Sequence, residues 1–190
     1  VENVNSNASL IADLVVQQLE DRVAFRRAIR EALKCAQDNE VNGIKIQVAG
    51  PLTLAALLET SRAGAILSDE IATKDVAQSL AYGVELMVAD LRRRLPGVTS
   101  VVVQLDEPLI TQIMRGAIKS ASGFGRIRIP SQDEVISLVA LFARDNELVM
   151  HSCAESVPIE LIGRTAVNAL SLDATLVGRA EYDLLAEMDD

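Results

Sequence analysis

The stretch Leu148-Val149-Met150-His151-Ser152-Cys153 gives the first indication of the fold. It is a short apolar run that ends in the only histidine of the chain and in one of its two cysteines. Side chains alternate along a strand, so a strand here would place His151 and Cys153 on one face at its carboxyl end. Parallel α/β sheets keep their ligand sites at that end. An imidazole and a thiolate there would supply half of a zinc site.

Apolar runs alternate with helical patterns on both sides of this stretch. Strands are predicted at residues 43–50, 101–105, 147–151 and 167–172, with a long helix over residues 69–95. This alternation predicts a parallel sheet with right-handed crossovers. Four strands are too few for an eight-stranded barrel. The expected fold class is therefore α/β: a four-stranded, mainly parallel sheet, as a partial (β/α) TIM-type barrel fragment with two extra N-terminal helices.

Two features of the same pattern concern segments outside the strands. The long helix ends in Arg92, Arg93 and Arg94, which suit the negative end of a helix dipole and are interpreted as a solvated helix end. Residues 116–130 are predicted to form a long loop, and such loops often cover substrates. The expected domains are a helical segment at residues 1–42 and a partial barrel at residues 43–190, together forming one folded unit.

Composition limits the classes of function. The chain has 190 residues, 49% of them hydrophobic, and a formal net charge of −9. The negative charge argues against nucleic acid as a partner, and no apolar run approaches the ~20 residues of a membrane span. Two cysteines in different contexts do not indicate a disulfide framework, so a cytoplasmic protein is expected. Open sheet edges predict a homo-oligomer.

Residues 51–190 resemble the C-terminal catalytic barrel of cobalamin-independent methionine synthase, in the uroporphyrinogen-decarboxylase-like superfamily. In that family the His-x-Cys pair binds zinc, a carboxylate after the following strand is the third ligand, and a later cysteine is the fourth. The blocks that carry the resemblance are Val48-Ala49-Gly50-Pro51, Val103-Gln104-Leu105-Asp106-Glu107-Pro108, Ala121-Ser122-Gly123-Phe124-Gly125, His151-Ser152-Cys153-Ala154 and Leu170-Ser171-Leu172-Asp173.

This resemblance implies zinc ligation by His151, Cys153 and Asp173, with no obvious replacement for the later cysteine. Asp106 would hold the amino group of homocysteine, supported by Glu107. The expected function is a methionine-synthase-like fragment with a remnant zinc and homocysteine site, weakly active or inactive. If active, it would be a zinc-dependent homocysteine S-methyltransferase, and its partner would be a small homocysteine-like thiol.

Residues 1–50 are similar instead to the middle of small-subunit ribosomal protein three. The resemblance rests on Leu19-Glu-Asp-Arg-Val-Ala-Phe-Arg-Arg-Ala28 and Gly43-Ile-Lys-Ile-Gln-Val-Ala-Gly50, and is expected to stop at Gly50, where Pro51 follows. In that family the arginines matching Arg26, Arg27 and Arg30 line the path of messenger RNA. Two resemblances that meet at one strand suggest a chimera.

Each candidate residue also has a purely structural interpretation. His151 suits a hydrogen-bonded core position, while Asp106, Glu107 and Asp173 suit turn caps. The arginines at 22, 26 and 30 share one helix face, and nearby acidic residues allow a solvated, ion-paired surface. Two alternative functions therefore stay open. One is a chimeric or fusion protein whose role is folding only, and the other is an RNA-binding module that uses Arg22, Arg26, Arg27 and Arg30.

Overall fold

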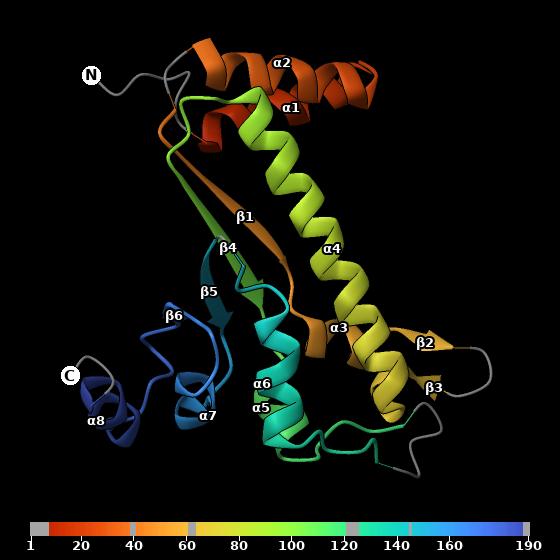
Figure 1. Cartoon of the computed structure of the whole chain (residues 1–190), viewed down its shortest axis with the longest axis vertical. Coiled ribbons are helices and arrows are strands. Elements are labelled where there is room, and N and C mark those ends of the chain that lie inside the picture. Colours follow the sequence, from red (N-terminus) through yellow and green to blue (C-terminus); the bar gives the residue numbers. More distant parts are fainter. Residues whose placement is uncertain (1–7, 39–40, 61–63, 121–125, 145, 188–190) are drawn as a thin grey trace. The chain divides into compact units, whose positions relative to one another are not determined.

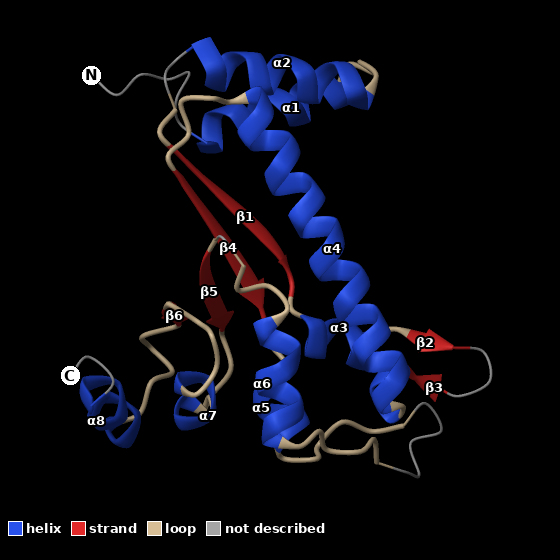
Figure 2. Ribbon diagram, in the orientation of Figure 1, coloured by secondary structure: helices blue, strands red, loops and turns tan. Residues whose placement is uncertain are grey.

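The computed structural model of the chain describes residues 8–38, 41–60, 64–120, 126–144 and 146–187. In these residues each of the strands β1, β4, β5 and β6 is followed by at least one helix, as Figures 1 and 2 show. The helices are α1 (Ala8–Glu20), α2 (Phe25–Asp38), α3 (Pro51–Leu57), the 3₁₀ helix η2 (Ile66–Ser68), α4 (Glu70–Arg94), α5 (Ile110–Met114), α6 (Gln132–Ala140), α7 (Ile159–Gly163) and α8 (Arg179–Glu187). The strands are β1 (Gly43–Ala49), β2 (Glu59–Thr60), β3 (Gly64–Ala65), β4 (Ser100–Asp106), β5 (Glu147–Ser152) and β6 (Ala169–Leu172).

Four of these strands form one sheet, in the order β1-β4-β5-β6. β4 pairs in parallel with β5, and β5 with β6, and the arrows of β1 and β4 run in the same direction in Figure 1. This confirms the expected α/β class with a four-stranded parallel sheet. The expectation of a TIM-type barrel fragment is not supported, because the described strands form only this sheet and a separate antiparallel pair, β2 and β3.

The central strands are the most apolar, because helices cover both faces of a parallel sheet. Val103 and Leu105 of β4 are fully buried, as are Leu148 and Met150 of β5. In the edge strand β1 only Ile46 is buried, and the polar residues Lys45 and Gln47 are exposed. The carboxyl ends of β4 and β5 are therefore anchored in the apolar core.

Contacts divide the chain into two compact units. Unit 1 consists of residues 1–44 and 86–101, and unit 2 of residues 45–85 and 102–190. Unit 1 contains α1, α2 and the last turns of α4, and unit 2 contains α3, α5–α8 and most of the sheet. The domain boundary expected after residue 42 stays a prediction. No helix in the described part of the chain is long and apolar enough to cross a membrane.

Candidate functional site

At the carboxyl end of the sheet, in unit 2, two of the predicted residues become neighbours. Asp106 of β4 pairs in register with His151 of β5, which in turn pairs with Ser171 of β6. The carboxylate of Asp106 accepts hydrogen bonds from the side-chain amides of Gln47 and Gln104, both at 2.6 Å. Parallel pairing thus brings residues from three strands to one edge of the sheet, as the sequence predicts.

The imidazole of His151 is half-buried and faces β6. Its Nδ1 lies 3.1 Å from the carbonyl oxygen of Ser171 and 3.2 Å from the Ser171 hydroxyl. The ring nitrogen can donate to the carbonyl oxygen or accept from the hydroxyl, according to its tautomer. The hydrogen-bonded arrangement matches the structural interpretation of this histidine.

The other predicted zinc ligands do not complete a metal site. Cys153 is exposed with a free thiol beyond the end of β5. Asp173 accepts hydrogen bonds from the backbone and hydroxyl of Thr175, and these bonds lower the pKa of its carboxyl. No group of three or more His, Cys, Asp or Glu side chains within the described ranges is placed to hold a metal. The residues present do not fit the expected zinc centre.

Glu107, the residue after Asp106, is fully buried. Its Oε1 accepts the backbone N–H of Leu52 at 2.9 Å, and its Oε2 accepts the N–H and hydroxyl of Thr53 at 2.8 and 2.6 Å. The carboxyl therefore caps the first turn of α3, which begins at Pro51 after an N-cap, Gly50, that has no side chain. Burial raises the pKa of Glu107 to about 7, against the opposing effect of these hydrogen bonds. Its expected support of a substrate has no basis in this geometry, and it caps α3 rather than the turn that follows it.

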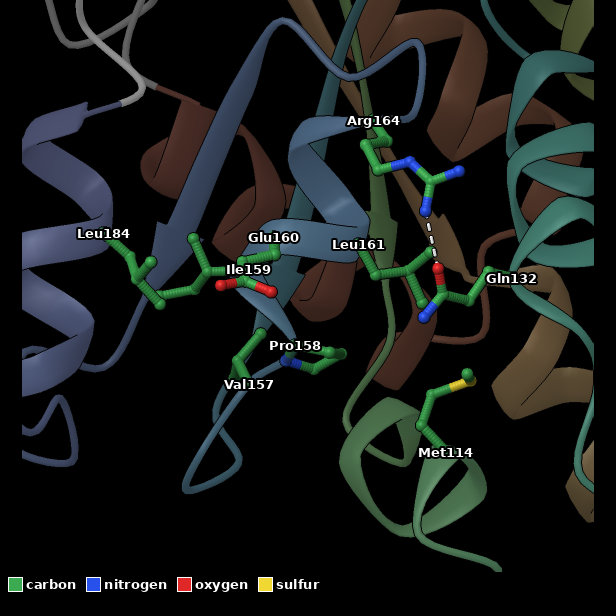
Figure 3. Close-up of a pocket in the computed structure, with 9 residues that line it drawn as sticks. All are labelled: Met114, Gln132, Val157, Pro158, Ile159, Glu160, Leu161, Arg164 and Leu184. Atoms are coloured by element: carbon green, nitrogen blue, oxygen red, sulfur yellow. Dashed lines mark hydrogen bonds between the residues drawn. The ribbon is translucent and has the colours of Figure 1, made fainter.

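A separate cleft of about 420 Å³ lies in unit 2 among α5, α6, α7 and α8 (Figure 3). Its lining is mostly apolar, with Met114 on one side and Leu184 on the other. The polar contact across it joins Arg164 to the side-chain oxygen of Gln132 at 2.5 Å. None of the predicted site residues lines this cleft.

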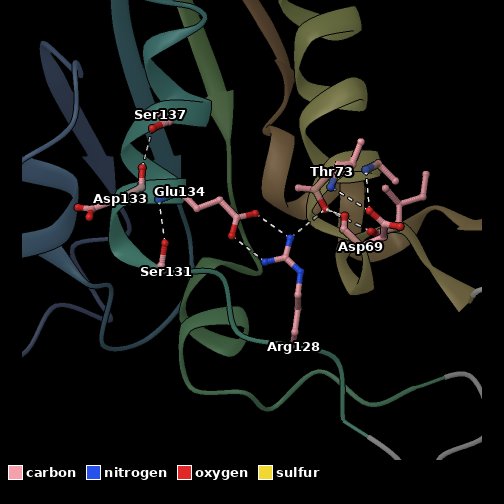
Figure 4. A network of polar contacts seen from close by, with 10 residues as sticks. Asp69, Thr73, Arg128, Ser131, Asp133, Glu134 and Ser137 are labelled. Carbon is pink, nitrogen blue, oxygen red and sulfur yellow. Dashed lines mark hydrogen bonds and ion pairs between the residues drawn. The ribbon is translucent and has the colours of Figure 1, made fainter.

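The predicted long loop, residues 116–130, is anchored within residues 126–130, while residues 121–125 lie outside the described residues. Arg128 binds both carboxylate oxygens of Glu134 at 2.7 Å, and a weaker contact of 3.4 Å reaches Thr73 (Figure 4). Asp69 accepts the N–H groups of Ile71 and Ala72, so it caps α4. This end of the loop is thus tied to the starts of α4 and α6.

In unit 1, a basic stripe, defined here as Arg22, Arg26, Arg30 and Lys34, begins in the turn after α1 and continues along α2. These residues recur every four positions, so the last three lie on one helix face about 6 Å apart along the axis. All four are exposed, and none forms an ion pair with another residue in the described part of unit 1. Arg27 instead pairs with Glu31 at 3.0 Å and lowers the pKa of that carboxyl. Lys34 was missed at the sequence level, although the same four-residue spacing includes it.

The first residue of the stripe has an unusual backbone. Arg22 has a φ of 60°, in the left-handed region that favours glycine. Its N–H binds the carbonyl of Leu19, and the next N–H, of Val23, binds the carbonyl of Gln18. These two bonds form a Schellman motif that ends α1 with arginine in the position glycine usually takes.

Arg22→Gly is therefore expected to raise the free energy of unfolding by about 1 kcal/mol, because glycine adopts this conformation without strain. Chemical denaturation in urea measures this gain. Arg22→Ala is the control: it also removes the guanidinium but keeps a β-carbon, so it should give no gain. Equal stability of the glycine and alanine variants would contradict the interpretation.

The basic stripe lies in a segment that matches a known family. The sequence profile described as ribosomal protein S3, C-terminal domain, matches residues 15–88. Small ribosomal subunit protein uS3c of Thalassiosira pseudonana is 79% identical over 57 residues, which are 30% of this chain and 27% of that protein. That of Trieres chinensis is 68% identical over 57 residues, with the same coverage. The uS3 protein of a Picosynechococcus species is 53% identical over 60 residues, 32% of this chain and 25% of that protein.

These matches correct the expected function. The methionine-synthase-like methyltransferase with a homocysteine partner is wrong, because the family and the relatives found are those of a small-subunit ribosomal protein. Nothing found supports the barrel resemblance of residues 51–190 or the chimera. The family match also continues to residue 88, past the limit expected at Gly50.

The exclusion of nucleic acid was also wrong, because the matched family and relatives are ribosomal proteins. The net charge of the whole chain hides an uneven distribution: residues 1–44 and 86–101 contain eight basic and eight acidic residues, so the entire net charge of −9 belongs to unit 2.

No solved structure matches the chain. The chain spans about a quarter of the length of the curated relatives it matches. Over residues 15–88 it is similar to the C-terminal domain of ribosomal protein S3.

Proposed function

We propose that unit 1 is an RNA-binding module of the ribosomal protein S3 type, and that the basic stripe contacts RNA phosphates. The observation that carries this proposal is the placement of Arg26, Arg30 and Lys34 on one exposed face of α2, within the segment similar to S3. Cations without acidic partners can neutralise phosphates and release counterions. Arg27 contributes less, since Glu31 already neutralises it.

The scaffold of the stripe supports this role. Ala28 is fully buried, and α2 packs against α1. The side chain of Gln18 on α1 donates to Glu31 at 2.6 Å, which ties α2 to α1 beside the stripe. Because α2 is already held against α1, it does not have to become ordered when RNA binds, so binding loses less conformational entropy. The expected cytoplasmic location stays a prediction.

The proposal predicts that Arg26→Gln/Arg30→Gln weakens RNA binding by about tenfold at 0.1 M salt. Two lost phosphate contacts should also lower the slope of log K against log salt concentration by about 1.4. Fluorescence anisotropy with a labelled 20-nucleotide single-stranded RNA measures both quantities on the full chain.

The matched control is Arg115→Gln/Arg164→Gln, which removes two exposed cations from unit 2 and changes net charge equally. This variant should bind like the wild type. Equal losses in both variants would reduce the effect to net charge, and the absence of any RNA binding by the wild type would refute the proposed function.

A further inference from the structure

In unit 2, two exposed cations face each other where the chain passes from α5 to α6 (Figure 1). Lys119 and Arg126 are partners in an antiparallel bridge, and the N–H of Ile127 donates to the carbonyl oxygen of Ile118 at 3.2 Å. Because this bond joins the residues beside the pair, Lys119 and Arg126 form a non-hydrogen-bonded pair. In such a pair the two Cα atoms are only about 4.5 Å apart, and both side chains leave the backbone on one face.

A second contact confirms the register of these two segments. A β-carbon built on Gly116 would lie 2.8 Å from Cδ1 of Ile129, so these two residues also lie close together. Gly116 is three residues before Lys119, and Ile129 is three residues after Arg126, so both contacts belong to one antiparallel register. Ile127 is buried. The pair of cations is therefore held by a backbone that is anchored in the core.

Neither cation has an acidic partner among the residues that the structure describes. The intervening residues 120–125 include no acidic residue in the sequence. Arg128 provides a contrast, because Glu134 binds its guanidinium with both carboxylate oxygens. Like charges directly opposite each other on paired strands are destabilising. An anion bound between Lys119 and Arg126 would remove this repulsion.

Two adjacent cations suit an anion that carries two charges. A phosphate monoester has close to two negative charges at pH 7 and offers three acceptor oxygens, whereas a phosphodiester has one charge. An arginine binds two of these oxygens as a fork, and a lysine adds a compact charge. At physiological salt the Debye length is ~8 Å, so the negative charge elsewhere on unit 2 is largely screened at this pair.

We propose that Lys119 and Arg126 form a binding site for a phosphate monoester group. The site lies in unit 2, apart from the basic stripe, and goes beyond the proposed function. Small phosphorylated molecules and the 5′ end of an RNA both carry this group, and the test below separates these two sources.

The probes are methyl phosphate, which is a dianion, and dimethyl phosphate, which is a monoanion. Isothermal titration calorimetry on the full chain at pH 7.5 and 0.1 M salt measures their binding. We expect dimethyl phosphate to bind several-fold more weakly than methyl phosphate. Lys119→Gln/Arg126→Gln should weaken methyl phosphate binding by about tenfold.

The matched control is Lys45→Gln/Arg179→Gln, which also removes one lysine and one arginine, both exposed, from unit 2. It should bind methyl phosphate like the wild type. Lys119→Glu is a further variant, because it places a carboxylate opposite Arg126 and supplies the anion from within the chain. It should abolish methyl phosphate binding and raise the midpoint of thermal unfolding in phosphate-free buffer.

Three results would overturn the proposal: no binding of methyl phosphate by the wild type, equal affinity for the two probes, or equal losses in the site and control variants. Fluorescence anisotropy with 12-nucleotide RNAs identifies the source of the group. A preference for a 5′-phosphate over a 5′-hydroxyl that Lys119→Gln/Arg126→Gln removes assigns the site to RNA ends, and equal binding of both RNAs assigns it to small phosphorylated molecules.

The proposed function is tested separately by Arg26→Gln/Arg30→Gln. If that variant keeps full RNA affinity, the role of the basic stripe fails, and the methyl phosphate results are unaffected. If methyl phosphate does not bind while the stripe variant loses RNA affinity, the site in unit 2 fails and the proposed function stands.

Discussion

Gly50→Ala is expected to lower the free energy of unfolding by about 3 kcal/mol. A β-carbon at this position would overlap Cγ, Cδ and Oε1 of Glu107. That side chain is fully buried, and three hydrogen bonds hold its carboxyl, so it has no room to move aside. Displacing it would also remove the cap of α3. Equilibrium denaturation in urea measures the loss.

The matched control for this substitution is Gly83→Ala in the middle of α4. No atom lies within 4 Å of a β-carbon built there, and the glycine has an ordinary helical backbone. Alanine should therefore stabilise the helix by up to about 1 kcal/mol. A Gly50→Ala variant as stable as the wild type would show that the Glu107 carboxyl does not occupy the space beside Gly50.

The stability of the chain is expected to fall as pH rises from 4.5 to about 7, because of Glu107. Burial raises the pKa of this carboxyl from 4.5 to about 7. Between these values the unfolded chain has released the proton while the folded chain retains it. Stability therefore falls through this window and levels off above it. The full effect is on the order of 3 kcal/mol.

Glu107→Gln isolates this contribution, since glutamine has the same shape and no titrating proton. As pH rises from 4.5 to 8, the unfolding free energy of the wild type should fall relative to that of the variant. Urea denaturation at several pH values measures the difference, in which other titrating groups cancel. A difference independent of pH would mean that the carboxyl has the same pKa in the folded and unfolded chains.

Local patterns predicted the sheet because each strand has its own signal. The alternation in residues 43–49 and the apolar run ending at His151 can each be recognised from residues that are adjacent in sequence. The parallel pairing of the strands follows from the helices that connect them. The two-residue strands β2 and β3 are too short to show any periodicity, so the sequence does not reveal them.

The role of Glu107 could not be predicted, because its partners lie far away in the chain. Leu52 and Thr53 are 55 and 54 residues from it in sequence. Their N–H groups come within reach of Glu107 only in the folded chain, where α3 lies beside the end of β4. RNA binding was judged from the net charge of the whole chain, and that sum conceals the three cations on one face of α2 and the fourth in the turn before it.

In unit 1, the hydrogen bond from the Thr99 hydroxyl to the carbonyl oxygen of Asn42 closes a loop of 57 residues. Bringing the ends of such a loop together costs roughly 4 kcal/mol of chain entropy if the intervening residues are unstructured. Residues 45–85, which belong to unit 2, reduce this cost once they have folded. The stability of the recess between α2 and the turn after α4, which Gln37, Asn42 and Pro96 line, therefore depends on order in the intervening segment, although the recess contains no residue from residues 45–85.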